Sequence, residues 1–249
     1  MKKNALFKDF FREIRLSLNR FLSIMLIVAP GVAFYTGVKS SQPDMHASAD
    51  ALFDEINLMD IRVMSGLGIT EDDLAALSAI EGVTAVRGGW TAHAINEQNG
   101  KQAVVVLHSL DGDMNRVTLT EGRLPEKADE CFMDSNWLHA AGFSVGDTIT
   151  LKSGKDDADI TDTLSTDTFT IVGAGSYSWY LTFERGTADV GSGDVSFFLC
   201  VPPEAFSMEV YTAAYLTCDG LDAENSYGKP YEEQIEIITE RIEIGRAHV

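Results

Sequence analysis

The sequence predicts an α+β extracytoplasmic domain following one amino-terminal transmembrane helix. Two observations predict this class. Residues 21–38 form an uncharged run of eighteen, and the chain after it alternates short strand-like and helix-like segments. Charge divides at the same place, because the first 40 residues hold seven Lys/Arg against two acids in a chain of net charge −19. The acidic remainder argues against nucleic acid as a partner.

Residues 1–20 are expected to form an amphipathic helix in the cytoplasm. Its basic residues Lys8, Arg12 and Arg15 lie mostly away from an apolar stripe at steps of three and four, made of Leu6, Phe7, Phe10, Phe11, Ile14 and Leu18. Such a helix lies along a membrane surface and contacts lipid. Two interpretations stay open: a simple anchor, or a contact for a cytoplasmic partner made by Phe11, Arg12 and Arg15.

Residues 21–38 are the expected transmembrane helix. Eighteen helical residues span about 27 Å, close to the hydrocarbon thickness of a bilayer. A cleaved signal is disfavoured, because some twenty residues precede the run and no AxA site follows it; a buried helix of a soluble protein is the third possibility. Six basic residues precede the run and only Lys39 lies just beyond it, so the amino terminus should stay in the cytoplasm of a cell-membrane protein, with residues after about 39 extracytoplasmic.

Pro30 and Gly31 lie in the middle of this run. Proline removes one helical hydrogen bond, so a kink is expected there. Neighbouring helices could satisfy the freed carbonyl, which would indicate partner helices, but a tolerated kink without a function explains the pair equally well.

Residues 39–60 are the expected stalk, helical from Ser48 to Asp60, and residues 61–227 the two-lobed domain. After the strand "MDIRVMSG", "ITEDDLAALSAIEG" predicts a helix that begins after Thr70 as its N-cap and ends at Gly82. "VTAVRGGWTAHAI" and "KQAVVVLHSL" then predict two strands joined by a hairpin at Asn99-Gly100. Strand, helix, strand, strand is the first lobe.

The second lobe is expected to be mostly strands. Its elements are a strand at Glu130–Met133, a helix at Ser135–Ala141, a strand at Thr148–Lys152, a polar surface loop "SGKDDADITDTLSTD", and strands in "TFTIVGAGSYSWYL", "DVSFFLCVP" and "EVYTAAYLTCDG". The aromatic residues of this region are expected in the core more than in an exposed contact; they are Tyr177, Trp179, Tyr180 and Phe183.

Residues 228–242 predict the start of a long or coiled-coil helix, because Tyr231, Ile235, Ile238 and Ile242 recur at steps of four, three and four. The last seven residues, 243–249 or "EIGRAHV", look like read-through into a sequencing adapter. The natural protein is therefore expected to continue past Ile242.

No catalytic residue, metal site or cofactor is predicted. The cysteines are too far apart for a metal motif, and Cys131, Cys200 and Cys218 are expected as buried strand residues, with a Cys200–Cys218 disulfide the less favoured alternative. "GTADVGSGD" lacks the lysine and Ser/Thr of a phosphate-binding loop. Acidic pairs are expected as solvated loops rather than weak Ca²⁺ sites; these are Asp111 with Asp113, and Asp156 and Asp157 with Asp159.

Three segments carry a resemblance to a known family: "DIRVMSGLGITEDDLAALSAIEGVTAVRGG", "EGRLPEKADECFMDS" and "GFSVGDTITL". In this order, behind one span, they resemble the amino-terminal portion of ABC transporter permeases of the MacB/FtsX-like class, especially the long Gram-positive forms. The resemblance covers nearly all of the chain up to Ile242. Its most specific part is Glu121–Glu130 with Val145–Leu151.

The resemblance implies a non-catalytic membrane subunit whose external domain lies between the first span and a later bundle of helices. That external domain is expected to have a βαβ-like lobe and a second, mostly β lobe. Its implied partners are a second permease copy and a cytoplasmic ABC ATPase subunit that hydrolyses the ATP. The implied function is to relay ATP-driven conformational change for export or for control of envelope enzymes. The rival hypothesis is a singly anchored extracellular binding protein without an ATPase, and a secreted enzyme is a third. The transported substrate, the direction of transport and any external partner stay open.

Overall fold

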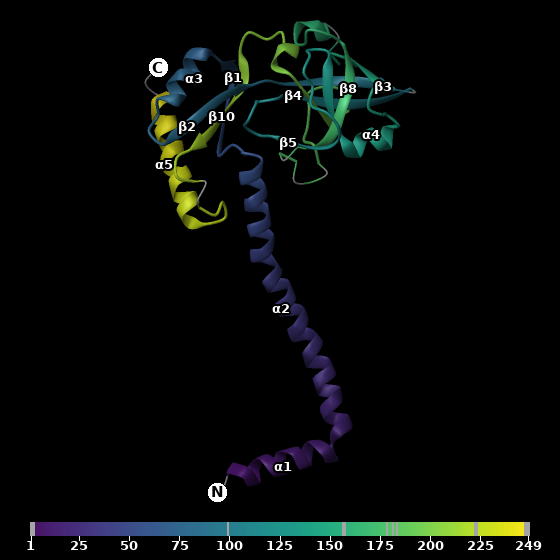
Figure 1. Ribbon diagram of the computed structural model, residues 1–249, viewed down its shortest axis with the longest axis vertical. Coiled ribbons are helices and arrows are strands. Elements are labelled where there is room, and N and C mark those ends of the chain that lie inside the picture. The colour runs from purple at the N-terminus through teal and green to yellow at the C-terminus, as the bar shows by residue number, and fades with distance from the viewer. Residues whose placement is uncertain are drawn as a thin grey trace. The chain divides into compact units, whose positions relative to one another are not determined.

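The computed structural model describes residues 3–98, 100–155, 158–177, 179–180, 182, 184–221 and 224–246 (Figure 1). The chain divides into two compact units, Met1–Ala49 and Asp50–Val249. Each unit is described by itself.

The described residues of the first unit, 3–49, lie in two helices joined at Ser17. Helix α1 runs from Lys3 to Leu16, and α2 runs from Leu18 to Glu55, so that its last two turns belong to the second unit. No residue of α2 is buried, and both Pro30 and Pro43 lie inside it. Within the described ranges, α2 is the one helix long and apolar enough to cross a membrane, judged by length and composition.

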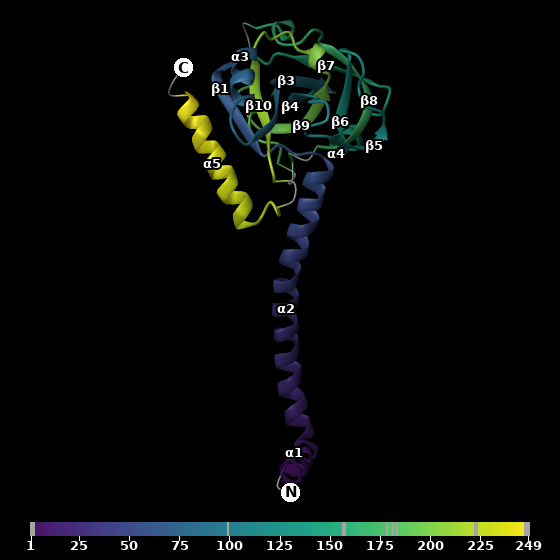
Figure 2. The ribbon, with the colours of Figure 1, turned by 60° about the vertical axis from the view of Figure 1, so that its left-hand side comes forward.

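A three-stranded antiparallel sheet forms the first part of the second unit, in the order β1 (Ile61–Ile69), β10 (Tyr211–Cys218), β2 (Val83–Gly89). Helices α3 (Glu71–Ser78) and α5 (Lys229–Arg246) pack on it, as Figures 1 and 2 show. The predicted N-cap of α3 is confirmed, because the Thr70 side chain accepts a hydrogen bond from the Asp73 backbone N–H. The predicted end at Gly82 is wrong: α3 ends at Ser78, since the Ala79 N–H already bonds back to Ala76 and Leu77.

A closed barrel forms the second part. Seven strands of the described chain join in the order β5 (Val117–Gly122), β8 (Thr168–Tyr177), β6 (Glu130–Asp134), β9 (Val195–Val201), β4 (Lys101–Ser109), β3 (Thr91–Gln98), β7 (Thr148–Lys152). An additional β8–β7 pairing closes the sheet and leaves β5 attached to the second half of β8. Helix α4 (Ser135–Ala141) lies where predicted, and two short 3₁₀ turns are η1 (Ile160–Asp162) and η2 (Pro203–Ala205).

Residues 83–95 were predicted as one strand, and this is wrong. The chain changes sheets at Trp90, so β2 belongs to the small sheet and β3 to the barrel. The Trp90 ring stacks on Phe206, with centroids 5.9 Å apart, and its indole N–H donates to the Val210 carbonyl at 2.9 Å. Because these partners hold the ring between the sheets, the chain cannot continue as one strand. The predicted β3–β4 hairpin is confirmed, although Asn99 lies outside the described residues.

The interior of the barrel is apolar, with Phe169, Phe197 and Leu107 fully buried. The predicted state of the cysteines is confirmed: Cys131, Cys200 and Cys218 are buried and unpaired.

Core packing is likewise confirmed for three of the predicted aromatic residues, because Tyr177, Trp179 and Tyr180 pack against the cluster that contains Phe198. Phe183 lies outside the described residues.

The loop that follows β7 was predicted as polar surface, which is only partly right. Ile160 and Leu164 are buried in the barrel core, so they anchor the loop. Asp156 and Asp157 lie outside the described residues, whereas Asp159 caps η1 through its side chain.

Candidate functional site: the root of the stalk

The residues predicted to contact a cytoplasmic partner lie on α1. Phe11 is 63% exposed, and Arg12 and Arg15 are exposed as well. The Phe10 and Phe11 rings meet edge to face, with centroids 6.0 Å apart. The partner contact itself stays a prediction.

Pro30 and Gly31 lie within the continuous helix α2, and a Cβ added at Gly31 would meet nothing within 4 Å. Near them the small side chains of Ala29 and Ala33 leave a shallow groove on the exposed surface of α2. The predicted kink stays a prediction.

Hydrogen bonds fasten the last turns of α2 inside the second unit. The Asp50 carboxylate accepts from the Ser226 backbone N–H and hydroxyl, both at 2.7 Å, and from the Asn225 side-chain amide at 3.2 Å. These bonds to Ser226 lower the pKa of Asp50. Asp50 therefore ties the end of α2 to the turn that precedes α5.

Residues 56–59, which follow α2, are bonded to the turn before β5. The Ile56 and Asn57 carbonyls accept from the backbone N–H groups of Arg116 and Asn115, both at 2.9 Å. The Met59 N–H donates to the Asn115 side-chain oxygen at 3.0 Å. Asn57 and Asn115 both adopt positive φ, 51° and 52°, a conformation that asparagine tolerates better than most residues. The chain leaving α2 is thus held by the segment that leads into the barrel.

Asp60 makes the connection to the small sheet. Its carboxylate accepts from the Cys218 backbone N–H at the end of β10 and from the Tyr231 hydroxyl in the first turn of α5, both at 2.7 Å. Burial and the bond to Asp60 raise the pKa of the Tyr231 hydroxyl, which therefore remains a donor at neutral pH.

A cleft of about 610 Å³ opens between these connections. Its walls include Phe53 and Asp54 from α2, Arg116 from the turn before β5, Tyr227 just before α5 and Tyr231 in the first turn of α5. The Phe53 and Tyr227 rings lie 6.4 Å apart between centroids. We refer to this space as the root cleft.

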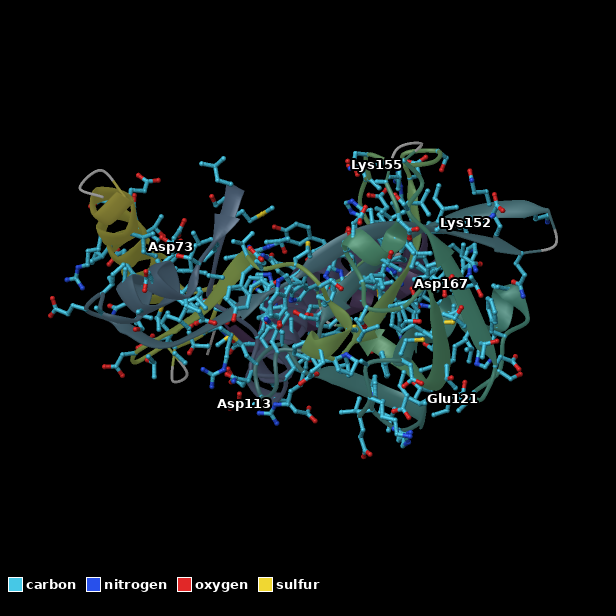
Figure 3. All side chains as sticks on the ribbon, turned by 90° about the horizontal axis from the view of Figure 1, so that it is seen from above. Asp73, Asp113, Glu121, Lys152, Lys155 and Asp167 are labelled. Atoms are coloured by element: carbon cyan, nitrogen blue, oxygen red, sulfur yellow. The ribbon has the colours of Figure 1, made fainter. Side chains whose placement is uncertain are left out.

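Asp113, in the turn beside the root cleft, lies on the surface in Figure 3, as do Lys152 and Lys155 of the barrel. The Asp113 side chain pairs with Arg87 at 3.8 Å. Its backbone carbonyl accepts from the Asn57 side-chain amide at 3.0 Å and from Arg116 Nε at 3.1 Å. The carbonyl of this turn, and not its charge, therefore holds the segment that follows α2.

His108 and Asp111 are two titratable residues of the second unit whose surroundings shift their pKa. His108 Nε2 lies 2.6 Å from the Tyr180 hydroxyl, and burial lowers the pKa of His108 to about 3, so the ring is neutral. Asp111 lies between the Ser109 hydroxyl and the Asn115 amide, and burial raises its pKa to about 6 in spite of both hydrogen bonds.

The two His108 nitrogens face the Tyr180 and Thr91 hydroxyls. Across the described ranges, no group of three or more His, Cys, Asp or Glu could hold a metal ion. The glycine-rich segment 186–194 is a mostly exposed loop, closed by a Thr187–Asp194 bridge and anchored by buried Val190.

Sequence reasoning missed Asp50, Asp60 and Asn115. Their hydrogen-bond partners lie far along the chain, 176 residues from Asp50 to Ser226 and 171 from Asp60 to Tyr231. The one local signal was asparagine in "INLMD" and "DGDMN", where it favours tight turns.

No family model matches the chain, and no curated protein matches it. Solved structures show similarity at low identity. The chain is similar to the extracellular domain of the noncanonic ABC-type transporter YknZ from Gram-positive bacteria, at 12% identity and a TM-score of 0.41, over 71% of this chain and 87% of that one. It is also similar to the periplasmic region of MacB from Actinobacillus actinomycetemcomitans, at 13% identity and a TM-score of 0.37, over 72% and 73%.

A third similar structure is a domain of a putative permease protein from Porphyromonas gingivalis, at 17% identity and a TM-score of 0.35, over 72% of this chain and 78% of that one. Similarity at this level does not establish a shared function.

Proposed function

We propose that this chain is part of a permease-type membrane subunit. In this proposal α2 spans the cell membrane, α1 stays in the cytoplasm, and the unit from Asp50 onward lies outside. The subunit relays conformational change driven by a separate ABC ATPase, for export or for control of envelope enzymes. One observation carries the proposal: a single helix, α2, holds an apolar segment with no buried residue and ends in hydrogen bonds that fasten it into a folded domain.

The hydrogen bonds at the root supply a route for the relay. A displacement of α2 reaches the turn before α5 through Asp50 and Ser226, and the small sheet through Asp60 and Cys218. It reaches the barrel through residues 56–59 and the turn before β5. The small sheet and the barrel are bonded to the end of α2 through different residues. In this proposal a displacement of α2 therefore tilts the small sheet relative to the barrel.

The exposed residues of α1 support a cytoplasmic contact. Phe11 with Arg12 and Arg15 offers an apolar ring beside two fixed charges, a composition common at the centre of protein interfaces. The ATPase subunit would bind this surface, and a second permease copy would complete the assembly.

Co-purification tests the contact. The full-length protein, purified from its native membrane in mild detergent, should recover an ABC ATPase. The Arg12→Glu, Arg15→Glu variant should recover it at least fivefold less. Lys101→Glu with Lys127→Glu, an equal charge change at exposed positions of the second unit, is the matched control and should leave recovery unchanged. Equal recovery by all three proteins would contradict the role given to α1.

The gene sequence distinguishes the permease hypothesis from the hypothesis of a singly anchored binding protein. The permease hypothesis predicts a reading frame that continues past Ile242 into further apolar segments, next to an ABC ATPase gene. A stop codon near Ile242 and no ATPase gene nearby would favour the anchored binding protein.

A further inference from the structure

We propose that the root cleft is a binding site for an organic cation with an apolar body, such as a short basic peptide. Its volume, about 610 Å³, lies within the range of roughly 300–1,000 Å³ that is typical of small-ligand sites. The proposal concerns binding alone and holds whether or not an ATPase drives the protein.

The aromatic walls select for a cation. Phe53, Tyr227 and Tyr231 line the cleft, and Tyr227 is 48% exposed. A Lys or Arg side chain is attracted to the face of such a ring, and its methylene groups cover the apolar surface. Leu58 and Met59 add apolar surface for the body of the ligand.

The charge of the residues around the cleft also favours a cation. The segments from which its lining residues come, taken over their described residues 50–60, 111–116, 221 and 224–233, contain nine acidic residues against Arg116 and Lys229. This surplus raises the local concentration of cations and repels anions.

The two carboxylates in the walls differ in what they can still bind. Both oxygens of Asp60 accept bonds from the protein itself. The Asp54 side chain is exposed, and its carboxylate makes no hydrogen bond or ion pair with the residues that the structure describes. Asp54 is therefore the group that a bound cation would contact.

Arg116 lines the cleft beside the end of α2. Its backbone N–H donates to the Ile56 carbonyl at 2.9 Å, and its Nε donates to the Asp113 carbonyl at 3.1 Å. Guanidinium N–H groups can also donate to carbonyl groups of a bound peptide.

Calorimetric titration of the full chain in nanodiscs of zwitterionic lipid tests the site, with empty nanodiscs as the blank. The probes are the tetrapeptide amide Leu-Arg-Leu-Arg, its neutral analogue Leu-Gln-Leu-Gln, and spermine, which has charge but no apolar body. We expect one saturable site for the basic peptide, with binding at least tenfold weaker for the other two. Binding of the basic peptide should also weaken as salt rises.

Variants locate the site. Asp54→Asn with Tyr227→Leu should weaken binding of the basic peptide by about tenfold, from the loss of one ion pair and one cation–aromatic contact. Asp72→Asn, an exposed carboxylate on α3, is the matched control and should bind as the native chain does. Both variants change exposed side chains, so equal melting temperatures serve as the check on folding.

Three results would overturn the proposal: no saturable binding of the basic peptide at 1 mM, equal binding of the neutral peptide or of spermine, or equal binding by the native chain and the Asp54→Asn, Tyr227→Leu variant. None of these results depends on whether an ATPase co-purifies with the protein.

Discussion

Helices α2 and α5 differ in the exposure of their apolar residues. In α2 the residues around the middle of the apolar run face outward, with Ile27 77% and Val28 54% exposed. In α5 the stripe made of Tyr231, Ile235, Ile238 and Ile242 packs against the small sheet, with Ile238 only 1% exposed. Figure 2 shows α5 beside β1 and β10.

The difference lies in where each helix finds an apolar partner. The stripe of α5 has spacing that also fits a coiled-coil seam, but it finds its apolar partner within the same unit. Residues 21–38 of α2 carry no charge, and no residue of α2 is buried. In the proposed topology their partner is lipid or other helices.

The largest expected effect comes from placing charge in α2, which tests whether its apolar residues lie in lipid. Ile27→Arg with Val28→Arg should cost about 5–7 kcal/mol of insertion free energy, since each Arg near the centre of a span costs about 2.5–3.5 kcal/mol. The variant should be extracted from membranes by alkaline carbonate, while the native chain stays in the pellet. Ile237→Arg, at a position of α5 that is 49% exposed, is the control and should also stay in the pellet.

A substitution in the buried stripe of α5 should lower the free energy of unfolding. Ile238→Ala should lower the free energy of unfolding by about 2–5 kcal/mol, because it leaves a cavity against the small sheet. Ile237→Ala, one residue earlier and exposed, should change it by less than about 0.5 kcal/mol. Urea unfolding of the full chain in detergent measures both. Equal losses would mean that α5 does not pack as described.

The elements that the sequence predicted well are those whose signals are local. The capping pattern at Thr70, the helix at Ser135–Ala141 and the Asn99-Gly100 hairpin depend on neighbouring residues, and the predicted helices and strand pair form there. The change of sheet at Trp90 depends on Phe206 and Val210, far along the chain, so periodicity did not reveal it.

The site was predicted less completely than the fold. The apolar run pointed to α2, but the carboxylates that fasten its end pair with residues that no pattern associates with them. Asp50 and Asp60 are two acids among many in an acidic chain, and only their contacts with Ser226 and Tyr231 distinguish them.

The Tyr231 hydroxyl tests the contact between α5 and the segment that follows α2. Tyr231→Phe removes the bond to the Asp60 carboxylate and should cost about 1.5–3 kcal/mol of unfolding free energy. A double-mutant cycle with Asp60→Asn should show coupling between the two positions. Additive effects would mean that the bond contributes no stability.

The smallest expected effect concerns pH. Burial raises the pKa of Asp111 to about 6, so the folded chain keeps a proton that the unfolded chain has lost. Asp111 therefore makes a contribution to stability that is fully present below about pH 4 and is lost, by about 1 kcal/mol, as the pH rises through about 6. Asp111→Asn should remove this contribution, measured as the difference between the two proteins from pH 4 to pH 7. Identical slopes would contradict the raised pKa of Asp111.

The most direct test of the central claim is to find which side of the membrane each unit occupies. All three native cysteines are buried and unpaired, so an added surface cysteine is labelled over a low background. In intact cells a membrane-impermeant maleimide should label His139→Cys at once, and should label Lys8→Cys only after the cells are permeabilised. Labelling of His139→Cys only after permeabilisation would place the folded unit in the cytosol and contradict the proposed topology.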